Sequence, residues 1–245
     1  MIPYERQQKI LELLENAELL KIDYLIQEFS SVSESTLRRD LKELEKQNKI
    51  ELLAGGAVKK ISTEGEIPIA DRHVLHNDEK TKIAEAAAKL IHDGDTIYLD
   101  SGTSCYELFK HISDRHITIY TSNTAMLYAG EPFTAEVIVL PGRFNRTNLS
   151  VSGSMTESAL KDLYFNKCFL GVNGVDEKFG FTTPSVEEAN KKKLVKSHSD
   201  QCYILCDSSK FHKLTSVKVF DLRDVTVISD QPNENISSRV KMITE

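Results

Sequence analysis

Three short stretches with helical spacing of apolar residues open the chain. Apolar residues recur on one face of residues 6–17, and a second such stretch follows Asp23, which we expect to cap a helix. Ser33 is placed to cap a third helix, which we expect to end at Asn48. The apolar stripe of that third helix recurs at i, i+4 and i+7 and consists of Leu37, Leu41 and Leu44. The pattern predicts three short helices that pack through these faces.

A hairpin pattern follows the helices. The stretch IELLAGGAVKK alternates like two strands around a turn at Gly55 and Gly56. Three helices and a hairpin within about 60 residues are typical of a winged helix-turn-helix domain. We therefore expect such a domain over residues 1–58.

The pattern changes after the hairpin. Residues 59–77 have no clean period and contain Gly65 and Pro68, so we expect a linker there. From residue 78 to residue 245, apolar runs alternate with helical patterns, which predicts an α/β domain with a mostly parallel sheet covered on both faces. The strands expected are 96–100, 117–120, 136–140, 167–172, 201–207 and 225–228. The helices expected are 79–92, 103–112, 155–163 and 186–199.

Net charge and composition limit the partners, the cellular location and the metal sites that can be expected for this chain. The net charge of the 245-residue chain is −6, and its first 60 residues carry ten Lys/Arg against eleven Asp/Glu, so any contact with nucleic acid would use a local patch. The chain has no signal-like start and no apolar run near the roughly 18 residues that span a bilayer, which favours a cytoplasmic protein without membrane contact. The cysteines and histidines have no ligand-like spacing, so we expect free thiols, no metal and no cofactor.

The third helix offers a candidate DNA-binding face. If its leucines face the core, its polar positions face outward, and a recognition helix presents its N-terminal residues to base edges. We expect Arg39 to bind a guanine or a phosphate, and Arg38 and Lys42 to bind phosphates. The full candidate set is Ser33, Ser35, Thr36, Arg38, Arg39 and Lys42. The alternative is a solvated helix face with ion pairs, because Asp40, Glu43 and Glu45 interleave with the basic residues.

The N-terminal stretches ERQQKILELLEN, SSVSESTLRRDLKEL and LAGGAV resemble the head of DeoR-type bacterial transcription regulators. The hallmark of that family is a Ser-x-x-Thr-hydrophobic-Arg-Arg-Asp-Leu recognition helix followed by a Gly-Gly wing. The matching residues here are Ser33, Thr36, Arg38, Arg39, Asp40, Leu41, Gly55 and Gly56. Ala54 stands where the family often has a basic residue, so Lys59 and Lys60 are the candidates for a wing contact.

A polar turn in the second half is a candidate anion site. Asp100, Ser101, Gly102, Thr103 and Ser104 lie between a predicted strand and a predicted helix, where backbone N–H groups and hydroxyls suit a phosphate. A second polar turn, with Thr121 and Asn123, follows the next strand, and the two turns would share one crevice at the carboxyl edge of a parallel sheet. The alternative is an ordinary strand-to-helix turn.

Later polar residues could complete this site. We include Asp176, which precedes a Gly-Phe-Thr-Thr stretch, and Lys210, which lies just past a strand end. Of the three lysines 191–193 we expect two to be solvated and assign Lys193 to the effector.

These stretches also resemble the DeoR-type effector domain, whose motifs stand here at 100–104, 121–123, 173–183 and 207–211. The resemblance implies a fold like that of ribose-5-phosphate isomerase and a site for a phosphorylated sugar. It implies a repressor of a sugar uptake or catabolism operon that binds operator DNA. Because a helix-turn-helix unit recognises one half-site, we expect a homo-oligomer. The alternative is a sugar-phosphate isomerase or deaminase with an accessory head, in which Asp176 or Glu188 would act as the base.

Overall fold

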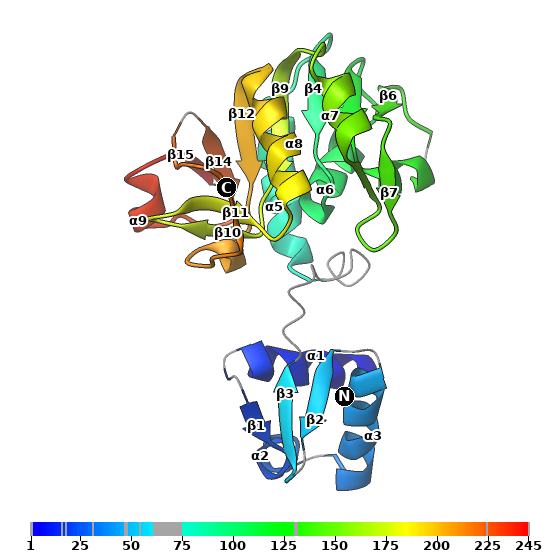
Figure 1. Ribbon diagram of the computed structural model, residues 1–245, viewed down its shortest axis with the longest axis vertical. Helices are drawn as coiled ribbons and strands as arrows, with labels where there is room; N and C mark the ends of the chain where they lie inside the picture. The colour runs from blue at the N-terminus through cyan, green and yellow to red at the C-terminus, as the bar shows by residue number, and fades with distance from the viewer. Residues whose placement is uncertain are drawn as a thin grey trace. The chain divides into compact units, whose positions relative to one another are not determined.

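The computed structural model describes residues 2–15, 17, 19–30, 32–46, 49–53, 55–60, 75–129, 132–223 and 225–244. The chain divides into two compact units, Met1–Gly65 and Glu66–Glu245 (Figure 1). The division falls within the stretch expected to be a linker, of which residues 61–74 lie outside the described residues. Asn48 and Ala54, expected to end the third helix and to precede the wing glycines, lie outside them as well.

The N-terminal unit contains the three expected helices and the expected hairpin. Its elements are α1 (Pro3–Glu15), β1 (Leu19–Lys21), α2 (Ile22–Glu28), α3 (Glu34–Lys46), β2 (Ile50–Leu53) and β3 (Ala57–Lys60). The strands form an antiparallel sheet in the order β1-β3-β2. The core holds the leucine stripe of α3 together with Ile10, Leu25 and Phe29. The unit is a winged helix-turn-helix domain.

Two details of the helix starts differ from the prediction. α2 begins at Ile22, and Lys21 before it makes no side-chain cap, so the expectation that Asp23 caps this helix is wrong. Asp23 lies instead in the first turn, where its charge favours the positive end of the helix dipole. α1 begins at Pro3, three residues earlier than expected, because proline fits the first helical position.

The C-terminal unit is built on a seven-stranded sheet in which all strands run parallel, in the order β15-β14-β12-β9-β4-β5-β6. The strands are β4 (Thr96–Leu99), β5 (Thr118–Thr121), β6 (Glu136–Val139), β9 (Phe165–Gly171), β12 (Ser199–Leu205), β14 (Thr226–Ser229) and β15 (Lys241–Thr244). The helices are α5 (Asn77–Ala88), α6 (Thr103–Ile112), α7 (Ser154–Leu160) and α8 (Val186–Ser197). α5 and α6 cover one face and α7 and α8 the other, so the sheet is buried on both faces as predicted (Figure 1).

Short elements that the sequence pattern did not predict surround this sheet. An antiparallel hairpin pairs β7 (Arg143–Asn145) with β8 (Ser150–Ser152). A small antiparallel sheet contains β10 (Gly174–Asp176), β11 (Gly180–Thr183) and β13 (Val217–Phe220). The remaining elements are the 3-10 turns η1 (Thr124–Tyr128) and η2 (Ser208–Lys210) and the helix α9 (Glu234–Ser237). In the described part of the chain, every helix is too short or too polar to cross a membrane.

Candidate DNA-binding and effector-binding sites

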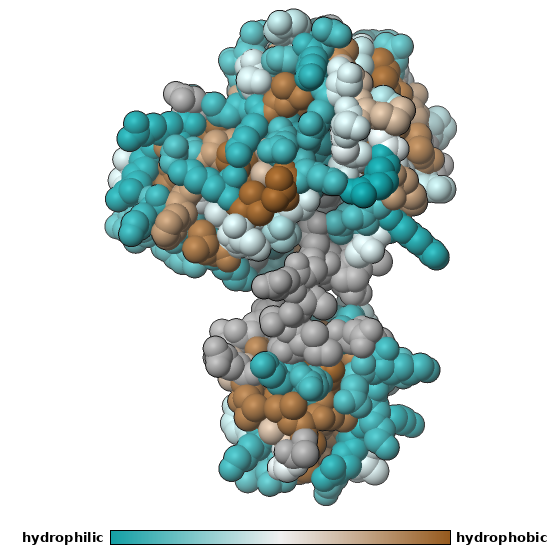
Figure 2. All heavy atoms as spheres, viewed as in Figure 1, coloured by the Kyte–Doolittle hydropathy of each residue, from teal (hydrophilic) through white to brown (hydrophobic). Residues whose placement is uncertain are grey.

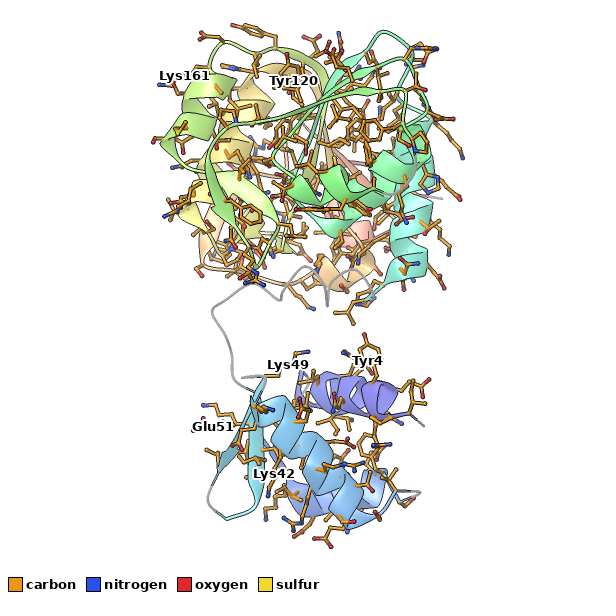
Figure 3. The ribbon with its side chains drawn as sticks, turned by 90° about the vertical axis from the view of Figure 1, so that its right-hand side faces the viewer. Tyr4, Lys42, Lys49, Glu51, Tyr120 and Lys161 are labelled. Carbon is orange, nitrogen blue, oxygen red and sulfur yellow. The ribbon has the colours of Figure 1, made fainter. Side chains whose placement is uncertain are left out.

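The helix α3 presents a polar outer face. Leu37, Leu41 and Leu44 are buried against the core, and Ser35, Arg38, Arg39 and Lys42 are exposed. Hydrophilic residues cover the side of the N-terminal unit where α3 lies (Figure 2). Lys42 stands on the outer side of α3, away from α1 (Figure 3). Within the described residues, Arg39 and Lys42 have no ion-pair partner, so both cations are available to an anionic surface.

The first turn of α3 gathers three hydroxyl groups. Ser33 Oγ accepts a hydrogen bond from the Thr36 N–H at 3.3 Å, as expected for a capping residue. The same Oγ lies 2.8 Å from the Thr36 hydroxyl and 3.1 Å from the Ser35 hydroxyl. Next to this cluster, Arg38 Nε donates to Glu34 Oε1 at 2.7 Å. The start of α3 therefore carries short polar groups together with an exposed ion pair.

Asp40 points to the core side of α3, away from the ion pair of Glu34 and Arg38. It is buried, and its carboxylate accepts a hydrogen bond from Arg6 Nε of α1, which is buried as well. The alternative interpretation, in which Asp40 belongs to a solvated charged face, is therefore wrong for this residue. The ion pair ties α3 to α1, and the pairing with Arg6 explains why a carboxylate is tolerated next to the leucine stripe.

The wing is a tight turn between β2 and β3. Gly55 and Gly56 have φ of 98° and 76°, which other residues rarely adopt, so the two glycines are what allows the hairpin to close here. Lys59 is exposed on β3.

In the C-terminal unit, the polar turn at 100–104 connects β4 to α6 as predicted. α6 begins at Thr103, and Gly102 before it makes no side-chain cap, so its first N–H groups are not satisfied by a capping side chain. A Cβ built on Gly102 would meet no atom within 4 Å, which means that open space lies over the start of the helix. Open space, amides without a capping side chain and the positive end of a helix dipole together suit an anion.

Asp100 lies beneath this turn rather than on its surface. Its side chain is completely buried, and one carboxylate oxygen accepts from the Gly171 N–H at 3.2 Å and from the ammonium of Lys192. The other oxygen, Oδ1, has no hydrogen-bond partner among the residues that the structure describes and lies 3.9 Å from Lys191 Nζ. Asp100 therefore positions the turn and a lysine.

Two lysines of α8 complete this buried network. Lys191 and Lys192 are 1% and 4% exposed, so the expectation that two of the three lysines are solvated is wrong. Lys191 Nζ donates to Glu188 Oε1 at 2.8 Å and to Ser122 Oγ at 3.0 Å. Lys193 is the exposed one and lines a shallow groove of about 380 Å³ between α7 and α8. This follows from helix geometry, because successive residues on α8 point about 100° apart.

Glu188 joins the network to the polar turn. It accepts from Lys191, lies 3.5 Å from Lys192 Nζ, and accepts from Ser101 Oγ at 3.3 Å. Burial on its own would raise the pKa of Glu188, but the two lysine ammonium groups outweigh it and lower the pKa to about 2. Glu188 is therefore ionised, and its charge is balanced inside the protein.

The second polar turn lies against the first, as the sequence predicts. Asn123 Nδ2 donates to the Gly102 carbonyl at 3.3 Å, and Thr121 Oγ1 donates to the Leu99 carbonyl at 2.7 Å. Both side chains are completely buried. Thr121 and Asn123 therefore hold the two turns together, beneath the surface that a ligand would touch.

Lys210 and Asp176 have different surroundings. Lys210 ends η2, is partly exposed, and its ammonium has no partner among the residues described here. The carboxylate of Asp176 accepts from the N–H groups of Lys178 and Phe179, both at 2.8 Å, and these bonds lower its pKa. Asp176 is thus engaged in closing the β10–β11 turn.

The β7–β8 hairpin borders the network. Arg143 Nη2 donates to both oxygens of Glu187, at 2.6 and 2.7 Å, and Ser152 Oγ donates to Glu187 Oε2 at 3.0 Å. The hydrogen bonds from Arg143 and Ser152 lower the pKa of Glu187. The Val151 carbonyl accepts from Lys191 at 3.4 Å, so strand β8 touches the buried lysine directly.

Sequence reasoning missed the group formed by Glu188, Lys191 and Lys192. The available signal was their spacing, because residues three and four apart share a helix face. The described residues contain no group of histidine, cysteine or acidic side chains suited to a metal ion, and the cysteines described are free and buried.

A winged helix-turn-helix unit followed by a parallel α/β unit is the organisation of a transcription regulator with its own sensor domain. The comparisons identify the family. The model of the DeoR-like helix-turn-helix domain matches residues 6–63, and that of the DeoR C terminal sensor domain matches residues 75–231. The chain belongs to the DeoR family of transcription regulators.

Curated relatives have sequences similar to this one over nearly its full length. The chain is 34% identical to the uncharacterized HTH-type transcriptional regulator YulB of Bacillus subtilis, over 92% of this chain and 88% of that one. It is 31% identical to the lactose phosphotransferase system repressor of Staphylococcus epidermidis, over 100% of both chains. Because these relatives are regulators, the enzyme alternative is set aside: the chain is a regulator and not an enzyme. Among solved structures, ribose 5-phosphate isomerase A from Methanocaldococcus jannaschii matches with a TM-score of 0.40 and 17% identity, over 55% of this chain and 54% of that one.

Proposed function

We propose that this protein represses an operon for sugar uptake or catabolism and leaves its operator when a phosphorylated sugar binds the C-terminal unit. The name of one relative supports the sugar link: the lactose phosphotransferase system repressor of Staphylococcus epidermidis is 31% identical to this chain. The domains proposed are residues 1–58 for DNA, 59–77 as a linker and 78–245 for the effector.

The outer face of α3 reads operator DNA in this proposal. The hydroxyls of Ser33, Ser35 and Thr36 meet base edges, and Arg39 and Lys42 provide cations that no described residue neutralises. Since a helix-turn-helix unit reads one half-site, we propose that two or more copies of the chain act together.

The single observation that carries the effector site is the open, uncapped start of α6. The ligand's phosphate accepts from the N–H groups after Gly102 and from the hydroxyls of Thr103 and Ser104. The Ser101 hydroxyl, which donates to Glu188 without a ligand, turns to donate to the phosphate instead. Lys210, whose ammonium has no described partner, supplies the compensating charge. Asp100, Thr121 and Asn123 act from below by holding the turn in place.

The test measures operator affinity of the full chain with and without individual phosphorylated sugars. Operator DNA is first obtained by selecting bound sequences from a randomised duplex library. A ligand that stabilises the folded protein in a thermal-shift screen should also weaken operator binding, typically by about 1–3 kcal/mol of coupling.

Single substitutions test where the phosphate of the ligand binds. Gly102→Val adds a side chain in the open space over α6, so it should abolish the effect of the sugar and leave operator affinity intact. Lys210→Ala should weaken the sugar's effect, whereas Lys161→Ala, at an exposed lysine just after α7, is the matched control. If the Gly102→Val protein leaves the operator at the sugar concentration that releases the parent, the phosphate binds elsewhere. If the parent binds the operator more tightly with sugar, the coupling has the opposite sign.

A further inference from the structure

The inference concerns the ion pair at the start of α3. Glu34 is the first residue of α3, and Arg38 lies one turn later on the same outer face. Arg38 Nε donates to Glu34 Oε1 at 2.7 Å, and the two side chains are 53% and 54% exposed. This carboxylate therefore stands on the surface that is proposed to meet DNA, where the neighbouring Arg39 has no described partner.

The hydrogen bond to Glu34 determines which nitrogen atoms of the Arg38 guanidinium are available to bind DNA. With Nε engaged by Glu34, the two terminal amino groups of Arg38 have no hydrogen-bond partner among the described residues and form an end-on fork. Such a fork matches the O6 and N7 acceptors of guanine, and also two oxygens of a phosphate. The Glu34 carboxylate favours the contact with guanine over the contact with phosphate. Its charge offsets the positive charge that attracts phosphate, and the carboxylate is itself repelled by the DNA backbone.

We propose that Glu34 is a specificity-determining residue, which holds Arg38 for guanine in the major groove and opposes its contact with phosphates. This inference rests on the proposed DNA-binding role of α3. It changes the role of Arg38, which the sequence led us to assign to phosphates, from sequence-independent binding to base reading.

With Glu34 present, we expect the protein to bind unrelated DNA less tightly than its positively charged side chains alone would bind it. In Glu34→Gln the amide carries no charge, so Arg38 regains its full attraction to phosphate. Affinity for unrelated duplex should rise about tenfold, and the preference for guanine at one base pair per half-site should fall about tenfold, the size of one base discrimination. The fold should be unaffected, because an exposed i,i+4 pair contributes little to stability.

The experiment uses the full chain and the operator selected from a randomised duplex library. Dissociation constants are measured for the operator, for operators changed at each base pair, and for a duplex without the motif, at several salt concentrations. Glu5→Gln is the matched control, because it removes one negative charge from the same unit on α1 and keeps an acceptor for the Ile2 N–H. Arg38→Lys keeps the charge and removes the fork.

Glu34→Gln and Arg38→Lys should lose preference at the same base pair, and Glu34→Gln should bind the unrelated duplex more tightly and with a steeper salt dependence than Glu5→Gln. If Glu34→Gln matches Glu5→Gln in both respects, or if Arg38→Lys keeps every base preference, the proposal is wrong although α3 still reads DNA. If the parent protein selects no motif at all, the proposed function fails instead.

Discussion

Replacing Glu188 with glutamine should destabilise the C-terminal unit by about 3 kcal/mol at pH 7. The ordinary pKa of 4.5 falls to about 2 in the folded protein, a difference of about 2.5 units, and each unit corresponds to about 1.4 kcal/mol. Glutamine keeps the size of the side chain and mimics the protonated acid, so it forfeits the attraction of Lys191 and Lys192. A unit of this size should remain folded after such a loss.

The pH dependence identifies the source of this loss. Because the folded state holds the Glu188 proton less tightly than the unfolded chain, the stabilisation is complete above pH 4.5 and disappears as the pH falls toward 2. The difference between parent and Glu188→Gln should therefore shrink from about 3 kcal/mol at pH 7 to about 2 kcal/mol at pH 3.5. Urea denaturation of the full chain, followed by circular dichroism, measures both values.

Glu187→Gln is the matched control in the same turn of α8. Its partner Arg143 is largely exposed, so loss of this surface pair should cost at most about 1 kcal/mol. Equal destabilisation by the two variants would refute the argument from burial. A Glu188→Gln deficit that stays constant between pH 7 and pH 3.5 would show that the lost stability does not come from the ionised carboxylate.

Three further predictions concern the N-terminal unit. Arg39→Ala should weaken operator binding at physiological salt, and unchanged affinity in a binding titration would remove α3 as the reader. Lys42→Ala should weaken binding evenly across sequences and flatten the salt dependence by about one unit of slope, because it would lose one phosphate contact. Residues 1–58 should fold alone with low stability and bind operator weakly; an isolated unit that binds as tightly as the full chain would show that the C-terminal unit contributes nothing to affinity.

The fold was predictable where the pattern of apolar residues is long enough to have a period. The leucine stripe and the apolar runs of the central strands predicted α3 and the parallel sheet. β1, β7, β8 and β10 were missed because strands of three residues show no period. The edge strand β15 was missed for a related reason: its four residues carry a lysine and a threonine around only two apolar residues.

The position of the candidate effector site could be predicted from the sequence, but the directions in which its side chains point could not. A strand followed by a glycine-containing polar turn and a helix predicted the open start of α6, and the pairing of Asn123 with Gly102 confirms that the two turns meet. Charge alone suggested that Lys191 and Lys192 are solvated. Their burial depends on Asp100, which lies 92 residues before Lys192 in the chain, and no local pattern contains that contact.

A buried carboxylate stands next to a proposed contact residue in both units, and this arrangement allows a last test. Asp40 precedes Leu41 and follows Arg39, and its partner Arg6 comes from another helix. Removing only the cation, as in Arg6→Met, leaves a buried charge and should cost about 3–5 kcal/mol, which is enough to unfold a domain of this size.

Replacing both partners by apolar residues, as in Arg6→Met with Asp40→Leu, should restore most of the stability, because buried ion pairs contribute little beyond the cost of dehydrating them. Operator affinity separates two roles for the pair. If the pair only stabilises the fold, affinity returns with stability; if it also sets the angle at which α3 meets α1, the double variant is folded and still binds weakly. Since Arg39 is adjacent to Asp40 on α3, we expect the second result, and full recovery of operator affinity in the folded double variant would contradict it.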